Sequence, residues 1–495
     1  MFMPDFALIS ELQGHPPKAR CQEERRKPNF SDKELVPQEG GGKLRVLLGS
    51  HHSMSTLEEL RAGKLAGVTR LQLTRDLTEF PIEIFDLADT LEILDLSGNA
   101  LTALPADLPR LHKLRVLFCS DNQFGELPEV LGSCPALSMI GFRNNLIRTV
   151  SAKAIPPQLR WLILTGNEIE SLPAELGARP LLQKLMLAGN HLRSLPAELA
   201  NCKQLELLRI AANRLSDLPP WLFEMPKLTW LAYAGNPFCI RLEKSASGKS
   251  ITWNQLRLQK KLGEGASGVI YRAESLHGTT SETVAVKLFK GAITSDGSPL
   301  CEMAACIAAG AHPNLIPVLG EVTGHPDGAH GLVMQLIDPA YENMAGPPSL
   351  DSCTRDIYRA GKRFSLNAML AIAHGIASAA SQLHARGIMH GDLYGHNILH
   401  CGEGRTLLGD FGAASFYAPD APHAAALQRL EVRAFGCLLE ELLERCDAPE
   451  TARAVLAQLA ALQAACLQDN GARPLFSEIE SRLSALRVAA LDNSF

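Results

Sequence analysis

Three glycines in residues 262–271, LGEGASGVIY, are the first feature that suggests chemistry. Gly263, Gly265 and Gly268 form a GxGxxG pattern, and glycine lets a backbone approach phosphate oxygens without a Cβ clash. The pattern alone is weak evidence, because dinucleotide-binding folds also use it. Apolar residues alternate in segments 256–261 and 269–275, which favours strand–turn–strand over strand–turn–helix. The segment therefore predicts a phosphate-binding turn between two strands.

Further motifs follow the glycines in a fixed order. Residues 284–287 read VAVK, residues 390–399 read HGDLYGHNIL, and residues 410–412 read DFG after two leucines. Acids and a lysine belong together where charge on a transferring phosphoryl group must be neutralised. With the glycine-rich turn, these motifs resemble those of the protein kinase family over roughly residues 251–488.

The resemblance implies roles for individual residues. Asp392 matches the catalytic aspartate that orients the substrate hydroxyl and accepts its proton, and Asn397 and Asp410 match the magnesium ligands. Lys287 matches the lysine that holds the α- and β-phosphates, and Glu302 is the only acid well placed to pair with it. The implied cofactors are ATP and Mg²⁺, and the implied substrate is a protein.

The resemblance also implies which residues surround the nucleotide. Met334 takes the gatekeeper position in the expected hinge strand, and Ala285 and Ile270 would sandwich the adenine. The implied ATP-binding residues are Leu262, Gly263, Glu264, Gly265, Ala266, Ser267, Gly268, Ile270, Ala285, Lys287 and Met334.

Several features depart from the family pattern. Gly391 replaces an arginine that normally receives activation-loop phosphate, and Tyr394 replaces the lysine that contacts the γ-phosphate in serine/threonine kinases. His396 or another basic group would have to stand in for that lysine. The 21 residues from Asp410 to Glu431 are few for this family. Three functions stay open: a kinase acting on Ser or Thr hydroxyls, a nucleotide-binding pseudokinase that serves as a scaffold, and a purely structural or adhesive repeat protein.

A repeat precedes the kinase-like segment. Residues 91–99, LEILDLSGN, fit the frame LxxLxLxxN, which returns six more times and ends at Asn236. Successive asparagines are 23, 23, 22, 23, 23 and 23 residues apart. The frame resembles the leucine-rich-repeat family, with about eight repeats over residues 68–239. Each LxxLxL predicts a short strand whose leucines are buried only when neighbouring repeats stack on both sides.

Period-two alternation places the other strand positions on the concave face of the repeats. That face is unusually apolar, and a large exposed apolar patch marks an interaction site. We predict that it binds a protein; the alternative is that the kinase domain or the N-terminal segment covers it. The predicted partner-binding residues are Val116, Phe118, Met139, Trp161, Ile163, Met186, Leu207 and Trp230.

The bulk composition limits the location and the partners. The net charge of −5 and the pI of about 6.3 argue against a nucleic-acid-binding surface that covers the whole protein. No apolar run approaches the roughly 20 residues that span a bilayer, so we expect no membrane span and a cytoplasmic location. The architecture therefore resembles soluble bacterial leucine-rich-repeat kinases more than plant receptor kinases.

We expect an α/β leucine-rich-repeat solenoid followed by a two-lobed α+β protein-kinase-like domain. The predicted divisions are a disordered leader over 1–53, repeats over 54–239, a linker over 240–250 and the kinase domain over 251–495.

Overall fold

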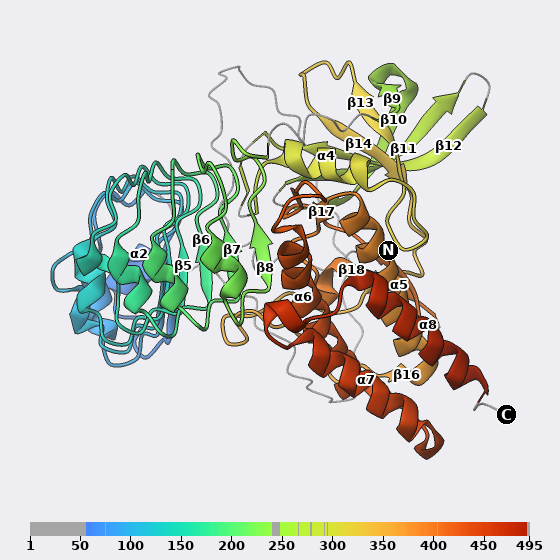
Figure 1. Cartoon of the computed structure of the whole chain (residues 1–495). Coiled ribbons are helices and arrows are strands. Elements are labelled where there is room, and N and C mark those ends of the chain that lie inside the picture. Colours follow the sequence, from blue (N-terminus) through green and yellow to red (C-terminus); the bar gives the residue numbers. More distant parts are fainter. Residues whose placement is uncertain are drawn as a thin grey trace, which may run out of the picture.

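A computed structural model describes residues 56–492, except residues 75, 240–247, 266, 278–279, 292, 295 and 403. The predicted leader over 1–53 and most of the predicted linker lie outside the described residues. Two bodies stand side by side: a curved stack of repeats, and a domain of two lobes (Figure 1). Both parts of the predicted fold class are confirmed.

The repeats form one parallel sheet of eight strands in chain order. The strands are β1 (Arg70–Gln72), β2 (Ile93–Asp95), β3 (Val116–Phe118), β4 (Met139–Gly141), β5 (Trp161–Ile163), β6 (Lys184–Met186), β7 (Leu207–Arg209) and β8 (Trp230–Ala232). The return arms carry the 3₁₀ helices η1 (Ile82–Leu87), η2 (Leu108–Arg110), η3 (Glu129–Ser133), η4 (Ala152–Ala154), η5 (Ala174–Ala178), η6 (Ala197–Asn201) and η7 (Pro220–Glu224). A short helix, α2 (Leu57–Arg61), begins at a capping box on Thr56 and precedes the first strand.

The repeated asparagines form a ladder inside the turns. The side-chain amide of Asn190 donates to the carbonyls of Leu164 and Leu187, both at 2.9 Å, and its oxygen accepts from the backbone N–H of Ile169 at 3.1 Å. A buried backbone group without such a partner would cost free energy, so the asparagine fixes the register of each repeat. The leucines of the frame form a continuous core along the stack.

The upper lobe of the second domain is a six-stranded sheet in the order β10-β11-β12-β14-β13-β9. Its elements are β9 (Ser250–Thr252), η8 (Trp253–Gln255), β10 (Leu256–Glu264), β11 (Gly268–His277), β12 (Thr280–Phe289), α4 (Pro299–Ala309), β13 (Val318–Thr323) and β14 (Gly331–Gln335). The glycine-rich segment joins β10 to β11 in an antiparallel hairpin, which confirms the predicted strand–turn–strand.

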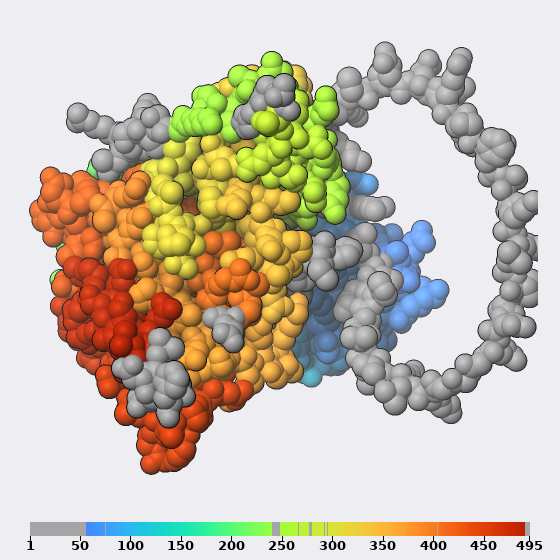
Figure 2. Space-filling model, turned by 90° about the vertical axis from the view of Figure 1, so that its right-hand side faces the viewer, coloured from blue at the N-terminus to red at the C-terminus, as the bar shows by residue number. Residues whose placement is uncertain are grey.

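The lower lobe is mostly helical. Its helices are α5 (Leu366–Ala385), α6 (Ala424–Glu444), α7 (Arg453–Cys466) and α8 (Phe476–Asp492), with the 3₁₀ turns η9 (Gly395–Asn397), η10 (Glu450–Ala452) and η11 (Asn470–Ala472). Short strands complete it: β15 (Glu342–Asn343), β16 (Phe364–Ser365), β17 (Ile388–Met389), β18 (Ile398–Cys401), β19 (Arg405–Leu408), β20 (Ser415–Phe416) and β21 (Cys446–Asp447). Seen from the side of the kinase domain, the two lobes lie one above the other, and the first repeats lie behind them (Figure 2).

The concave face of the repeats is buried against the second domain. Seven of the eight predicted partner-binding residues are at most 9% exposed, and they belong to one apolar cluster with residues of the lower lobe. Ile163, the eighth, is partly buried and packs on the same cluster. This packing corrects our expectation of an exposed apolar face and matches the alternative of intramolecular cover. A separate protein that binds this face would have to displace the kinase domain. Such binding stays a prediction.

Candidate active site

The predicted lysine and glutamate meet in the upper lobe. Lys287 lies on β12 and Glu302 on α4, and their side chains form an ion pair. The two side chains are 14% and 3% exposed. Burial disfavours the charge on Lys287, but the attraction of Glu302 and Asp410 outweighs it and raises the lysine pKa. The ammonium group is therefore held charged where a phosphate would be bound.

Several of the predicted nucleotide-binding residues lie on the strands around this pair. Ala285 and Met334 oppose each other across β12 and β14, and Ile270 pairs with Lys287 across β11 and β12. At the hairpin, Gly268 could not carry a side chain, because a Cβ there would lie 2.5 Å from the carbonyl oxygen of Leu288. Ala266 lies outside the described residues.

The loop that carries Asp392 is held from below by a buried carboxylate. Glu431 of α6 accepts hydrogen bonds from the backbone N–H groups of His390 (3.2 Å) and Gly391 (2.7 Å), and pairs with His384 at 2.7 Å. In the sequence Glu431 was noted as the end of the short segment that follows Asp410, and it was given no site role.

His390 orients the predicted catalytic aspartate, Asp392. The backbone N–H of Asp392 can only donate, so Nδ1 of His390 accepts from it at 3.3 Å. The imidazole proton then lies on Nε2, which donates to the carbonyl of Gly409 at 2.8 Å. His390 therefore links the loop of Asp392 to the segment that carries Asp410.

Asn397 and Asp410 have the chemistry of metal ligands. The side-chain amide of Asn397 donates to the backbone oxygen and to Oδ2 of Asp392, both at 2.9 Å. Its Oδ1 is buried without a hydrogen-bond partner, so it is free to coordinate a cation. Asp410 has a left-handed backbone (φ 55°) and an exposed carboxylate. Strain of this kind collects at functional sites.

These oxygens fit a hard divalent cation that also binds phosphate. Magnesium prefers oxygen ligands and takes one or two from the protein, with the rest from phosphates and water. Among the described residues, no group of three or more His, Cys, Asp or Glu gathers that could hold a metal ion alone. Asn397 and Asp410 would therefore share the cation with a nucleotide.

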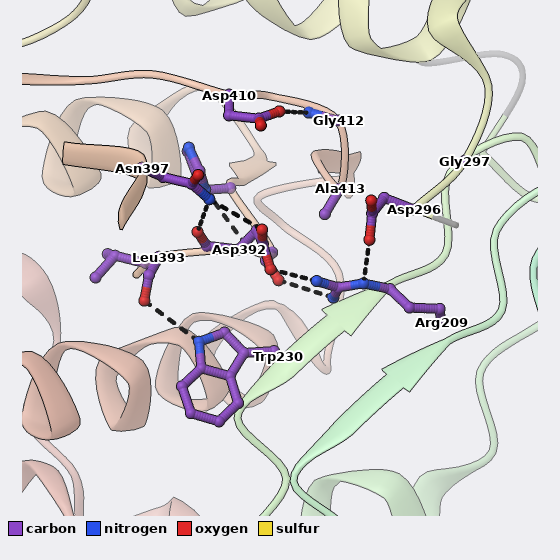
Figure 3. A network of polar contacts seen from close by, with 12 residues as sticks. Arg209, Trp230, Asp296, Gly297, Asp392, Leu393, Asn397, Asp410, Gly412 and Ala413 are labelled. Atoms are coloured by element: carbon purple, nitrogen blue, oxygen red, sulfur yellow. Dashed lines mark hydrogen bonds and ion pairs between the residues drawn. The ribbon is translucent and has the colours of Figure 1, made fainter. Parts of the chain in front are cut away.

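A residue that the sequence did not assign reaches the same site from the repeats. Arg209 at the end of β7 donates Nη1 to the carbonyl of Gly391 at 3.0 Å, Nη2 to Oδ1 of Asp392, and Nε to Asp296 at 2.8 Å (Figure 3). Its side chain is 2% exposed. Burial disfavours the guanidinium charge, but Asp392 and Asp296 outweigh it and raise the arginine pKa.

The two unusual residues of the loop that carries Asp392 fit this contact. Gly391 has φ 75°, and a Cβ on it would lie 2.5 Å from the carbonyl oxygen of Ala413 and 2.8 Å from that of Leu231 on β8. Tyr394 is buried and stacks on Trp230, with ring centroids 4.3 Å apart and planes at 7°. Both substitutions were visible in the sequence, and each marks a place where the repeats approach the loop.

His396 is not free to stand in for the lysine that Tyr394 replaces, a possibility that the sequence had left open. Its side chain is 12% exposed, and Nδ1 lies 2.7 Å from Oδ1 of Asp356. The other carboxylate oxygen, Oδ2, accepts from the backbone N–H of His396 at 2.9 Å. The other open possibility was another basic group, and Arg209 is the one that contacts Asp392.

Comparison with known proteins agrees with this geometry. Residues 256–433 match the protein tyrosine and serine/threonine kinase family, and residues 90–111 match the leucine-rich repeat. The chain is 29% identical to the chicken serine/threonine-protein kinase mos over 36% of its length and 53% of that protein. It is 27% identical to bovine cyclin-dependent kinase 10 over 37% of its length and 53% of that protein.

One solved structure, a leucine-rich-repeat protein of Leptospira interrogans, is similar at 27% identity and a TM-score of 0.35, over 39% of this chain and 50% of that chain. The chain spans about half or less of the length of the first curated relatives that it matches. No helix within the described part of the chain is both long and apolar enough to cross a bilayer. The chain thus joins leucine-rich repeats to a domain of the protein tyrosine and serine/threonine kinase family.

Proposed function

We propose that the protein transfers the γ-phosphate of ATP to Ser or Thr hydroxyls of a protein. One observation carries the proposal: Lys287, Glu302, Asp392, Asn397 and Asp410 come from four separate segments and converge on one site. The serine/threonine preference rests on the chicken relative's name and remains part of the proposal.

In this mechanism each residue has one task. Lys287 would bind the α- and β-phosphates, with Glu302 holding its ammonium in place. Asp392 would accept a hydrogen bond from the substrate hydroxyl and take its proton as the oxygen attacks the γ-phosphorus in line. Asn397 and Asp410 would hold Mg²⁺, which when bound neutralises charge on the phosphates. The repeats would in addition recognise a protein.

The test is transfer of radiolabelled phosphate from Mg-ATP by the full-length chain, alone and with a generic basic protein. Asp392→Asn and Lys287→Met should each abolish incorporation, since one removes the proton acceptor and the other the phosphate contact. Asp447→Asn is the matched control, because its carboxylate is 63% exposed and pairs with Arg363 away from the site. Equal labelling of wild type and Asp392→Asn would contradict the proposal.

A second candidate, a nucleotide-binding pseudokinase that acts as a scaffold, is supported by two observations. Arg209 pairs with Oδ1 of Asp392, and no lysine stands at position 394. Binding of ATP by the wild type without any phosphate transfer, under every metal and substrate condition tried, would favour this candidate.

A further inference from the structure

The starting point is the balance of charge around Asp392. Asp392, Asp410, Asp296 and Glu302 bring four carboxylates to this region, and bound ATP would add more negative charge. From the kinase domain, Lys287 reaches these carboxylates, and it already pairs with Glu302. The catalytic loop, residues 390–397, contains no Lys or Arg. Arg209 from the repeats supplies the missing positive charge.

Arg209 also connects the two lobes. Asp296 lies three residues before the start of α4, the helix that carries Glu302, and Asp392 lies in the lower lobe. One guanidinium therefore contacts the upper lobe through Nε and the lower lobe through Nη1 and Nη2 (Figure 3). A planar guanidinium can satisfy acceptors in several fixed directions at once, which a lysine cannot do.

The contact belongs to an interface that is built to stay closed. The concave face contributes an apolar surface buried with the lower lobe, and large apolar interfaces between domains do not open readily. Gly391 gives room to the backbone of β8, and the indole N–H of Trp230 donates to the carbonyl of Leu393 at 3.3 Å. Tyr394 fills the space under that indole.

The same contact leaves the site assembled. The Lys287–Glu302 pair is formed while Arg209 is in place, and an active kinase requires that pair. A carboxylate offers about four acceptor positions on its two oxygens. Arg209 occupies one on Oδ1 and Asn397 one on Oδ2, so Asp392 keeps acceptor capacity for a substrate hydroxyl.

We propose that Arg209 is a positioning residue of the phosphoryl-transfer site, which makes the repeat domain a part of the catalytic centre. It holds the carboxylate of Asp392 in the lower lobe at a fixed position relative to the segment before α4 in the upper lobe. This inference rests on the proposed kinase activity, and it gives the repeats a role in the reaction itself in addition to recognition of a protein.

The experiment compares full-length wild type with Arg209→Ala in phosphate transfer and in ATP binding. We expect kcat to fall about 100-fold, as for a misplaced catalytic group, while the dissociation constant for ATP is unchanged. Arg209→Lys should recover part of the rate, because it keeps the charge but not all three contacts. Guanidinium chloride, compared with equal sodium chloride, should raise the rate of Arg209→Ala alone, which loss of a merely structural contact would not allow.

Two further variants test whether a change in rate comes from misfolding of the protein. Asp296→Asn leaves Arg209 and Asp392 intact and should lower kcat by a smaller factor than Arg209→Ala. Arg160→Ala is the matched control: Arg160 also reaches across from the repeats, but it donates to the carbonyl of Asp351 at 3.2 Å, away from Asp392. It should leave kcat unchanged, and each variant should show the wild-type thermal transition of its repeats.

The outcomes separate this inference from the proposed function. An unchanged rate in Arg209→Ala would overturn the inference and leave the kinase activity standing. A faster rate, or activity that appears only in Arg209→Ala, would overturn it in favour of a repeat domain that blocks the substrate. If neither the wild type nor the variant transfers phosphate while both bind ATP, the proposed function itself fails and the inference fails with it.

Discussion

Two buried ion pairs define this site, and they differ in how they are built. Lys287 and Glu302 are 15 residues apart and lie in one lobe, whereas Arg209 and Asp392 are 183 residues apart and join two domains. In each pair one side chain is almost inaccessible: Glu302 is 3% exposed and Arg209 2%. Each pair also involves a residue to which the kinase family gives a catalytic role.

A neighbouring domain can compensate for a residue that the catalytic-loop segment lacks. Lys287 and Glu302 keep the family pattern because β12 and α4, two elements of the same lobe, bring them together without help from another domain. The second pair exists only because the repeats lie against the catalytic loop. Gly391 and Tyr394 replace two basic residues that are usual in this loop, and Arg209 of the neighbouring repeat domain contacts the loop at this place.

The largest effect on stability should come from breaking the pair inside the lobe. Glu302→Gln leaves the ammonium of Lys287 buried without its counter-charge, which costs about 3 kcal/mol in the free energy of unfolding of the kinase domain. Calorimetry of the full-length chain should show the kinase-domain transition at a lower temperature and the transition of the repeats unchanged.

The control for this change is the double variant Lys287→Met with Glu302→Leu. Replacing both charges of a buried pair by apolar side chains of similar size is often neutral, so most of the lost stability should return even though activity does not. A single variant as stable as the wild type would show that the pair is not effectively buried in solution.

A smaller loss in the free energy of unfolding should follow when a side chain at Gly391 pushes the two domains apart. Gly391→Ala places a Cβ against the carbonyls of Ala413 and Leu231, and overpacking of this kind costs about 2 kcal/mol. Gly361→Ala is the matched control, because Gly361 has φ 76° against 75° for Gly391 but no atom within 4 Å of the added Cβ. The difference between the two variants in thermal unfolding isolates the interface, and equal losses would mean that only backbone strain was measured.

Much of the fold could be predicted because its signals are local. The asparagine spacing predicts the repeat sheet, since each Asn satisfies backbone groups of its own and the neighbouring repeat. The predicted catalytic and metal residues could be proposed from the sequence for a similar reason, because Asp392 and Asn397 are held by contacts within one short loop.

The contact of Arg209 and the cover of the concave face could not be predicted, because both depend on how the two folded domains pack against each other. Arg209 occupies an ordinary concave position of a repeat, and nothing in its own segment distinguishes it from a solvent-exposed arginine. The apolar strand positions were correctly placed on one face, but period-two alternation does not say what covers that face. The available signal was indirect: the kinase loop lacked two basic residues and carried a glycine and a tyrosine in their place.

The smallest effect distinguishes two tryptophans on the concave face. The indole N–H of Trp230 donates to the carbonyl of Leu393, whereas the indole nitrogen of Trp161 is buried without a hydrogen-bond partner. Trp230→Phe keeps an aromatic ring beside Tyr394 but leaves that carbonyl without its donor, so it should cost about 1 kcal/mol more than Trp161→Phe. Chemical denaturation of the two variants measures this difference. Equal losses would show that Trp230 contributes only packing, and that the charged contact of Arg209 supplies the directional link between the repeats and the residues next to Asp392.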